Sequence, residues 1–359
     1  MIFTILNNGF EPVGDIDNAI SKIWDKHYRE EGYVEIYAAA TPRTLELLRE
    51  GFYITRDDDP CAARIYGIRT ETTEDDGDVI IASAKFAHTV LGQRIIWNTT
   101  NLSGNAEEAA RSLIVDNCIS PTDPQGNPMR ARIIPELELG ELQGLPDIIG
   151  DAQVSYENLL TYVLEICATF HYGLRAIIKA KKLAVGLYKG EDRSYGQTAN
   201  PFIVFSQDNE NLLGFTYQYD ESNKVNAALI GGEGEGLERA LANVGAATGL
   251  NRHEIFIDAK DITSKIDDGN GNEQTIAPDK YSMLLKERGW LNMVPALESF
   301  DAVVDLTRNY RYRQDFDVGD VVTIHDLRKG VYVNVRLMSV LESEDASGYH
   351  ITPTFAVDF

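Results

Sequence analysis

The chain has 359 residues, and 33 Lys and Arg against 56 Asp and Glu give it a formal net charge of −23. Nucleic acids and anionic membrane surfaces both attract grouped basic residues, so this composition excludes them as electrostatic partners. We therefore expect no stable nucleic-acid binding. The N-terminus lacks the basic region of a signal peptide, and no run approaches the roughly 18 apolar residues of a membrane helix. We expect cytoplasmic assembly and no membrane anchor.

The length predicts two to four domains, because single hydrophobic cores rarely grow beyond about 250–300 residues. The three cysteines, Cys61, Cys118 and Cys167, are far apart in the sequence. Such a scattered odd number indicates neither a disulfide framework nor a metal knuckle.

The first hundred residues predict β-structure with little helix. Residues 33–37 alternate polar and apolar side chains after a polar turn, as a half-buried strand does. Thr41 and Pro42 open a short helical turn that Gly51 closes. Short strands at close spacing are typical of a small barrel or sandwich. Further strands are expected over residues 52–54, 63–68 and 78–82.

The composition then shifts toward helix. Residues 103–117 place alanines and a leucine at helical spacing, with Ser103 or Asn105 as the N-cap. Residues 120–128 are dense in turn residues and predict a loop. A second helix is expected over residues 155–172, opened by its first residue and ended by a glycine.

Strand patterns return in the second half of the chain. Pro278 opens a predicted helix that ends at Gly289, and a second helical stretch is expected over 291–297. Residues 267–272 predict a turn. The overall order is β, then α, then β interrupted by α, then β. The strands expected here are 174–178, 183–187, 225–230, 253–258, 321–324, 331–338 and 349–355.

The most conspicuous motif is Gly231-Gly232-Glu233-Gly234-Glu235-Gly236, which follows a predicted strand. The dinucleotide-binding fingerprint needs its third glycine one residue later, where Leu237 stands, and a phosphate loop needs Gly-Lys-Ser/Thr. The two glutamates would also repel a phosphate. We interpret the motif as backbone that takes positive φ or closely approaches another chain, with the dinucleotide site as the weaker alternative.

No catalytic, cofactor or metal site is predicted. Residues 267–273 resemble a calcium loop in composition, but Glu273 stands where that loop needs glycine, so a hairpin or a flexible loop is favoured. The six histidines form no H-E-x-x-H motif, and only a zinc site assembled across the fold stays open. No G-x-S-x-G elbow is present, and carboxylate pairs are too common in this chain to indicate glycoside hydrolysis.

Several stretches occur in an order typical of one known family. They are an aromatic strand turning into an alternating strand (24–37), a barrel closure with a following helix (65–68 and 84–97), a strand–Gly-Glu-Gly–Arg segment that includes Arg239 (227–239), the next strand (252–261) and a late Gly319-Asp320 turn before a strand (316–324). On these stretches the chain resembles the tail-hub proteins of long-tailed, siphovirus-type bacteriophages and prophages. That group is similar to the baseplate hub of contractile tails.

The resemblance implies a β-rich α+β fold with two small antiparallel β-barrel domains, a helical or mixed middle region and a helix-containing insertion. The domains expected are a first barrel (1–100), a connecting domain (101–173), a second barrel (174–240 with 309–359) and an inserted α/β domain (241–308).

The resemblance also implies a non-enzymatic homotrimer in the virion, assembled in the bacterial cytoplasm, which forms a tail-tip ring and allows DNA passage. The partners expected are the distal tail protein ring, the end of the tape-measure protein and a tail fibre or spike. Two alternatives stay open, a tail-associated peptidase or cell-wall hydrolase and a host-glycan-binding tail module. The candidates for structural turns and subunit contacts are Gly231, Gly232, Gly234, Gly236, Arg239, Gly319 and Asp320.

Overall fold

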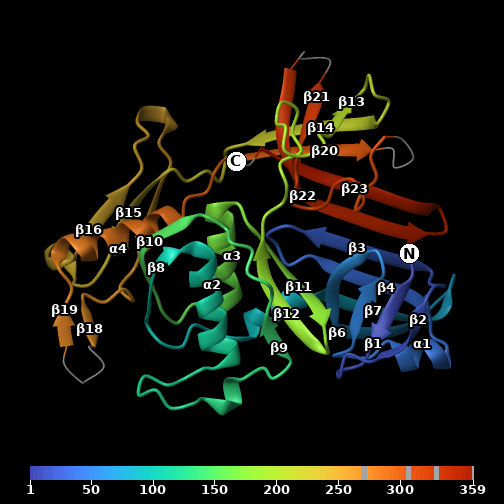
Figure 1. Cartoon of the computed structure of the whole chain (residues 1–359), viewed down its shortest axis with the longest axis horizontal. Coiled ribbons are helices and arrows are strands. Elements are labelled where there is room, and N and C mark those ends of the chain that lie inside the picture. The colour runs from blue at the N-terminus through green and yellow to red at the C-terminus, as the bar shows by residue number, and fades with distance from the viewer. Residues whose placement is uncertain (268–272, 305–308, 327–330, 358–359) are drawn as a thin grey trace.

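The computed structural model describes residues 1–267, 273–304, 309–326 and 331–357. Its fold is β-rich α+β, as the sequence predicts, and one sheet of 16 strands contains strands from both ends of the chain (Figure 1). Three smaller sheets and four α-helices complete the described structure.

The N-terminal part is built on an antiparallel hairpin, β3 (Ser21–His27) with β4 (Tyr33–Ala39), as predicted for the aromatic strand pair. Trp24 of β3 is fully buried and packs its ring edge-to-face on Phe86, with the ring centroids 5.0 Å apart. The predicted strands at 52–54, 63–68 and 78–82 are confirmed, and the prediction missed the first two strands of the chain. The other elements are β1 (Phe3–Leu6), β2 (Pro12–Ile16), α1 (Pro42–Leu47), β5 (Tyr53–Arg56), β6 (Asp59–Thr73) and β7 (Gly77–Phe86).

Both helices predicted in the middle of the chain are present, α2 (Ala106–Ile114) and α3 (Leu159–Phe170). Their apolar faces share one core with the hairpin of β11 and β12. None of the helices in the described ranges is long and apolar enough to span a bilayer. The strands of this part are β8 (Thr100–Asn105), β9 (Leu137–Leu139), β10 (Ile148–Val154), β11 (Gly173–Lys179) and β12 (Lys182–Tyr188).

The start of each helix is set by an asparagine. Asn105, one of the two predicted caps, accepts the N–H of Glu108 at 3.0 Å and begins α2. The predicted start of the second helix at Ser155 is wrong. Asn158 accepts the N–H of Thr161 at 3.2 Å, which satisfies a free donor of the first turn, so α3 begins at the next residue.

An α/β unit occupies one end of the molecule, at the left of Figure 1. Its helix α4 (Pro278–Leu291) starts at the predicted proline and packs on β15 and β16. The predicted helical stretch over 291–297 is wrong, because the chain leaves α4 at Leu291 and enters β20, which pairs with β14. The strands of its small sheet are β15 (Ala227–Gly231), β16 (Leu241–Val244) and β17 (Glu254–Asp258), whereas β14 (Leu212–Asp220) and β20 (Leu297–Val304) belong to the 16-stranded sheet.

The hairpin favoured over a calcium loop is also present in this unit. Strands β18 (Lys265–Asp267) and β19 (Glu273–Thr275) pair antiparallel. The predicted turn between them falls on residues 268–272, which lie outside the described residues.

The C-terminal strands join the N-terminal ones instead of closing on themselves. β22 (Val331–Asp345) pairs with β23 (Gly348–Ala356) on one side and with β3 on the other. Because β3 and β22 use their edges for each other, strands from both ends of the chain belong to one open sheet, and no closed barrel is seen among the described strands. The remaining strands are β13 (Val204–Ser206) and β21 (Val321–Asp326), and the sheet order is β14-β20-β23-β22-β3-β4-β7-β6-β11-β12-β9.

Four clusters of buried apolar side chains stabilise this arrangement. One lies inside the N-terminal strands and one around α2 and α3, a third is in the C-terminal strands, and the fourth is between α4 and its small sheet. The domain boundaries expected from the sequence stay a prediction.

Candidate functional site

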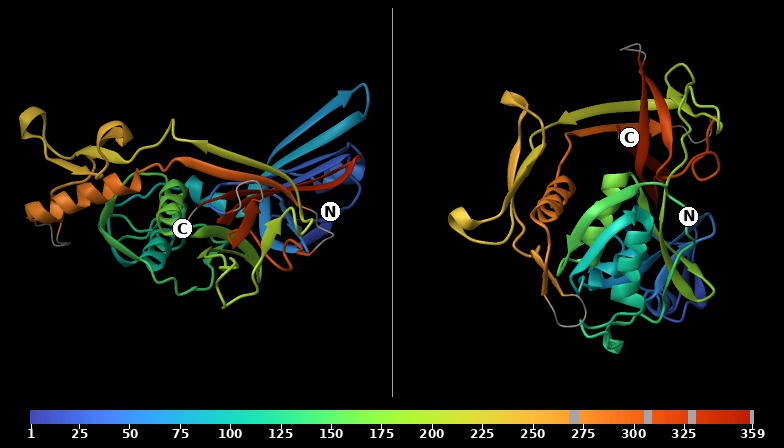
Figure 2. Two further views of the ribbon diagram at one scale, coloured as in Figure 1. Left: turned by 90° about the horizontal axis from the view of Figure 1, so that it is seen from above. Right: turned by 60° about the vertical axis from the view of Figure 1, so that its left-hand side comes forward.

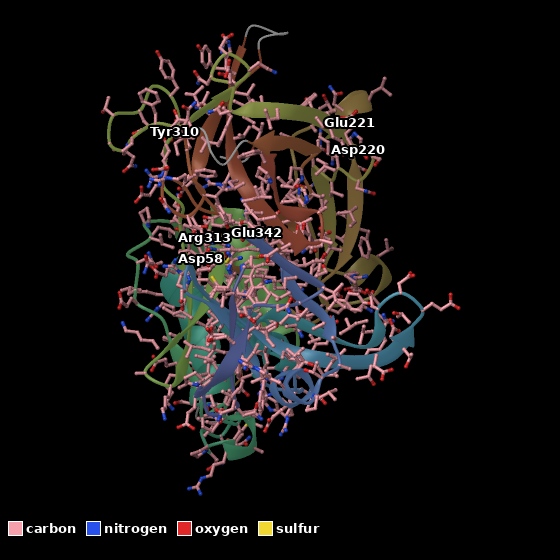
Figure 3. The ribbon with its side chains drawn as sticks, turned by 90° about the vertical axis from the view of Figure 1, so that its right-hand side faces the viewer. Asp58, Asp220, Glu221, Tyr310, Arg313 and Glu342 are labelled. Carbon is pink, nitrogen blue, oxygen red and sulfur yellow. The ribbon has the colours of Figure 1, made fainter. Side chains whose placement is uncertain are left out.

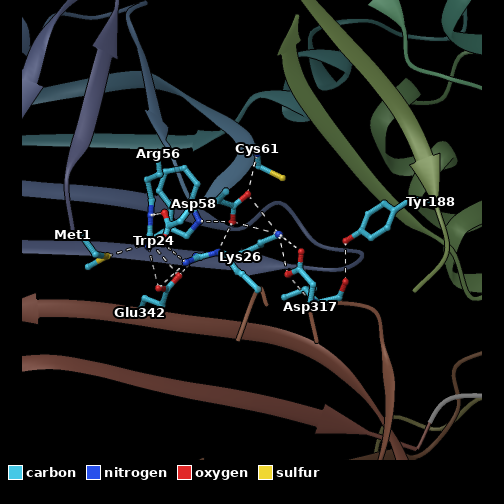
Figure 4. Close-up of polar contacts among 12 residues, drawn as sticks. Met1, Trp24, Lys26, Arg56, Asp58, Cys61, Tyr188, Asp317 and Glu342 are labelled. Carbon is cyan, nitrogen blue, oxygen red and sulfur yellow. Dashed lines mark hydrogen bonds and ion pairs between the residues drawn. The ribbon is translucent and has the colours of Figure 1, made fainter. Parts of the chain in front are cut away.

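The pairing of β3 with β22 joins residues more than 300 positions apart, and we call this pair the seam. It runs from Lys22 opposite Glu344 to His27 opposite Ser339. Charged side chains from three distant parts of the chain meet beside it (Figures 3 and 4). We call them the seam cluster: Lys26, Arg56, Asp58, Asp59, Arg313, Asp317 and Glu342.

Glu342 lies at the centre of the seam cluster, and its side chain is 0 % exposed. It accepts hydrogen bonds from Nη1 of Arg56 at 3.1 Å and from Nη1 of Arg313 at 3.1 Å. The hydroxyl of Tyr349 donates to the same carboxylate. A buried charge is tolerated when opposite charges and hydrogen-bond donors surround it, and Glu342 has both.

Asp59 connects the same cluster to the N-terminal strands, and its side chain is also 0 % exposed. Lys26 lies 3.3 Å from it, and Nε of Arg313 donates to it at 3.2 Å. The Nζ of Lys26 also forms an ion pair with Oδ1 of Asp317 at 3.1 Å (Figure 4). The cluster therefore holds the segment before β21 against both β3 and the start of β6.

At Asp59 and Arg313, the neighbouring opposite charges affect the pKa more than burial does. Burial alone would raise the pKa of Asp59, but Lys26 and Arg313 hold it below its usual range. Burial alone would lower the pKa of Arg313, but Tyr312, Glu342 and Asp59 raise it overall. Both groups thus stay charged and paired, and the arrangement acts as a structural tie between the two ends of the chain.

His27, at the end of the seam, gives the protein a pH dependence that can be measured. Burial opposes protonation, but hydrogen bonds to Asp25 (3.0 Å) and Glu30 (3.1 Å) raise the pKa of His27 from 6.5 to about 9. Because the folded pKa is raised, this stabilisation is complete below pH 6.5 and is lost as the pH rises through 9. His27→Gln should therefore lower the free energy of unfolding by about 1 kcal/mol at pH 6, since exposed Glu30 is screened.

Thermal unfolding of both proteins at pH 6 and pH 9.5 checks this prediction. The difference between wild type and His27→Gln should shrink at the higher pH. His253→Gln is the matched control, since its imidazole makes no hydrogen bond to the described residues. An equal difference at both pH values would contradict the assignment.

The structure brings the predicted glycine motif and Arg239 together in one turn after β15. The guanidinium of Arg239 donates to the carbonyl oxygen of Gly231 at 2.8 Å and to that of Gly232 at 3.1 Å. A Cβ at Gly231 would lie 2.5 Å from the guanidinium carbon, so only glycine leaves room for this contact. The predicted positive φ occurs at Gly234 (92°) and Gly236 (56°).

These contacts lie within one chain, and the role of the turn in subunit contacts stays a prediction. The motif passes through a single 3₁₀ turn (Gly236–Glu238) into β16 and opens no α-helix. A dinucleotide fingerprint opens a helix, so that alternative interpretation is wrong.

Gly319 and Asp320 lie in a different place, at the turn before β21. Gly319 has φ of 102° and packs against the ring of Tyr28, which follows β3. Burial raises the pKa of Asp320, whose carboxylate accepts the N–H of Glu191 at 2.8 Å and Nε of Arg193 at 3.0 Å. Both residues thus fix the turn to earlier segments of the same chain, and their role in subunit contacts stays a prediction.

Sequence reasoning missed the seam cluster, although β3 carried a signal for it. Lys22, Trp24 and Lys26 fall at alternate positions and are all buried, so two charges share the inner face of a strand with tryptophan. Inward-pointing charges on a strand indicate a partner that neutralises them. The partners, Glu344 for Lys22 and Asp317 for Lys26, are too distant in sequence for the pattern to name them.

The three cysteines are free and buried. Within the described ranges, no group of three His, Cys, Asp or Glu side chains is arranged to hold a metal ion. The absence of cofactor and metal stays a prediction.

Three solved structures that share this fold are tail proteins. The tail protein from Neisseria meningitidis MC58 has 11 % identity and a TM-score of 0.55, covering 99 % of this chain and 95 % of that one. Prophage tail protein gp18 from Listeria monocytogenes EGD-e and the 43 kDa tail protein of prophage MuSo2 from Shewanella oneidensis each have 11 % identity and a TM-score of 0.53. Each match covers 99 % of this chain. The matches cover 94 % of the Listeria protein and 98 % of the Shewanella protein. At this identity the likeness shows the fold, which is that of phage and prophage tail proteins.

The sequence agrees with this class. The chain belongs to the Siphovirus ReqiPepy6 Gp37-like protein family, whose model matches residues 2–355. The predicted resemblance to tail proteins of long-tailed phages is thereby confirmed, and with it a structural role in a phage tail. Among curated proteins none matches the chain.

Proposed function

We propose that this protein is the tail-tip hub of a phage or prophage, a homotrimeric ring that links the distal tail to the tip. The family and the shared fold support a structural tail role. The two strand-rich ends of the chain would act as the two barrel-like domains of each subunit, and the seam would hold them as one body. The proposed neighbours are the distal tail protein ring, the end of the tape-measure protein and a tail fibre or spike.

The observation that carries the trimer is an exposed apolar surface on the α/β unit. The strand register puts Leu229, Leu241 and Phe256 on one face of the small sheet, opposite the face that packs on α4. Their side chains are 43 %, 56 % and 52 % exposed. Leu237 and Leu250, before and after β16, are fully exposed. Soluble monomers rarely leave so many large apolar side chains in water, so we assign this surface to a second copy of the chain.

Light scattering and negative-stain imaging of the purified protein test the proposal. We expect a mass near three times the 40.0 kDa of the chain, and a threefold ring. The double variant Leu237→Glu with Leu250→Glu should shift the mass toward one chain, because charged side chains are disfavoured in an interface core. Leu142→Glu, at another exposed leucine, should leave the mass unchanged. Discrete monomers of the wild type would contradict the hub.

The proposed role is non-enzymatic, so the same preparations should produce no clearing on zymograms of bacterial cell walls. The charge of −23 fits a ring that DNA passes through, since acidic side chains facing the channel would repel the duplex. An electropositive lumen in the assembled ring would contradict this part of the proposal.

A further inference from the structure

A groove of about 800 Å³ lies between the start of β8, the loop over residues 120–128 and strand β18. It is far from the seam in sequence, and its walls come from the middle part of the chain and from the α/β unit. Figures 1 and 2 show the ribbons of these two parts next to each other. We call it the Trp97 groove. None of the residues already discussed for the seam or the subunit contacts lines it.

Two aromatic side chains line the Trp97 groove and are open to solvent. Trp97 is 43 % exposed and Tyr156 is 67 % exposed. The guanidinium of Arg132 lies 4.7 Å from the centre of the indole ring, and it donates to the carbonyl oxygen of Ile95 at 2.6 Å. Arg132 therefore stabilises the indole in this orientation through a cation–π contact.

The backbone conformation of Tyr156 keeps its side chain exposed to solvent. Its φ of 61° is rare for a bulky residue, and its N–H donates to the carbonyl oxygen of Ile96 at 2.7 Å. The N–H of Ile96 in turn donates to the backbone carbonyl oxygen of Glu157 at 2.8 Å. The two hydrogen bonds keep the strained residue in place, so both aromatic side chains are pre-organised on adjacent segments.

Between the aromatic side chains, the groove is lined by amides and hydroxyls. Gln153 donates to Oδ1 of Asn101 at 2.8 Å and accepts the N–H of Thr263 at 3.1 Å. Asn98 donates to the carbonyl oxygen of Thr122 at 2.9 Å, while its own Oδ1 is buried without a hydrogen-bond partner among the described residues. Thr99 and Gln125 also line the groove and are exposed, so a hydroxyl and an amide are available to the hydroxyls of a ligand.

The charge of the groove differs from that of the whole protein. Among the described residues, the charged ones that line it are Asp123 and Lys265, one of each sign. The chain as a whole carries −23. An ionic ligand is therefore not favoured, and a neutral polar one is.

We propose that the Trp97 groove binds a neutral saccharide, a run of two or three hexose units. Pyranose rings present C–H faces that pack on aromatic rings, and hydroxyls that both donate to and accept from amides. The groove offers both kinds of contact in one pre-formed concave site, with a volume in the range of ligand pockets. This inference goes beyond the hub and does not depend on the trimer.

Titration of the intact protein with maltohexaose, cellohexaose and chitohexaose, followed by calorimetry and tryptophan fluorescence, tests the proposal. We expect one hexasaccharide to bind, and Trp97→Ala to weaken its binding by at least about tenfold. Tyr156→Ala should also weaken binding. Trp97→Phe should recover part of the affinity, since an aromatic face is kept.

Trp290→Ala is the matched control, because Trp290 is 54 % exposed on α4 and does not line the groove. Its binding should equal that of the wild type, and circular dichroism verifies that each variant is folded. Absence of binding by all three hexasaccharides at 10 mM (roughly the weakest Kd that calorimetry resolves) would overturn the proposal. So would equal losses in Trp97→Ala and Trp290→Ala, or binding of a proline-rich peptide in place of the saccharides.

Discussion

Glu342→Ala should lower the free energy of unfolding by about 3–5 kcal/mol, one of the two largest effects that we expect in this protein. The substitution removes the carboxylate and leaves the guanidinium groups of Arg56 and Arg313 buried beside each other. Tyr349 loses its acceptor as well. Differential scanning calorimetry should show the first unfolding transition about 4–7 °C lower in a chain of this length.

The control for this prediction is an exposed ion pair in the same sheet. Arg69 and Glu71 lie 3.4 Å apart, with side chains 68 % and 38 % exposed. Glu71→Ala should change the transition by less than about 1 °C, because solvent screens such a pair. Equal shifts for Glu342→Ala and Glu71→Ala would show that the seam cluster contributes no more than a surface ion pair.

Gly319→Ala should be comparably destabilising, by about 3–5 kcal/mol, for two combined reasons. The backbone of Gly319 has φ of 102°, which a residue with a Cβ rarely adopts, and the added methyl would overlap the ring of Tyr28. That ring cannot move freely, because its hydroxyl donates to the carbonyl oxygen of His171 at 2.9 Å. Thermal unfolding and the yield of soluble protein measure the effect.

Two variants separate the two reasons. Gly348 has φ of 119° with open space around its Cβ position, so Gly348→Ala tests strain alone and should cost about 1–3 kcal/mol. Gly190→Ala tests overlap, since its methyl would overlap the carbonyl group of Gly319 itself. If Gly319→Ala behaves like Gly348→Ala, the contact with Tyr28 is not tight, and the overlap argument is wrong.

Local patterns in the sequence predicted the elements that are fixed by local interactions. The alternation over 33–37 is β4, and the cap candidate Asn105 begins α2 because its side chain bonds a free N–H nearby. The second helix was predicted to start at Ser155, because a serine can cap as well as an asparagine can. Which of the two residues accepts the bond depends on the packing around α3.

Patterns failed where a distant partner decides the structure. Residues 291–297 include Leu, Met and Ala, but Val294 exchanges two backbone hydrogen bonds with Val225, and Pro295 cannot continue a helix. Two closed barrels were expected for the same reason, since nothing near β3 in sequence indicates that β22 will pair with it. Tertiary pairing thus overrides local propensity.

The candidate sites also were predicted where their residues are neighbours in sequence and missed where the residues are distant. The turn of Gly231 and Arg239 was found because its residues are neighbours in sequence, and its contacts lie within the chain. The close approach to another chain expected there stays a prediction. The seam cluster was missed because Arg56 and Glu342 lie 286 positions apart. The Trp97 groove was missed because Trp97, Gln153 and Thr263 come from three separate segments.

The seam can form only late in the synthesis of the chain. Strand β3 leaves the ribosome early, but its partner β22 is translated more than 300 residues later, roughly 15–60 s at about 5–20 residues per second. During that interval one edge of β3 is unpaired, with Lys22 and Lys26 on its inner face. Unpaired edges promote association between nascent chains, and buried lysines oppose it. The charges that later tie the seam would therefore keep unfinished chains apart on the polysome until translation completes the sheet.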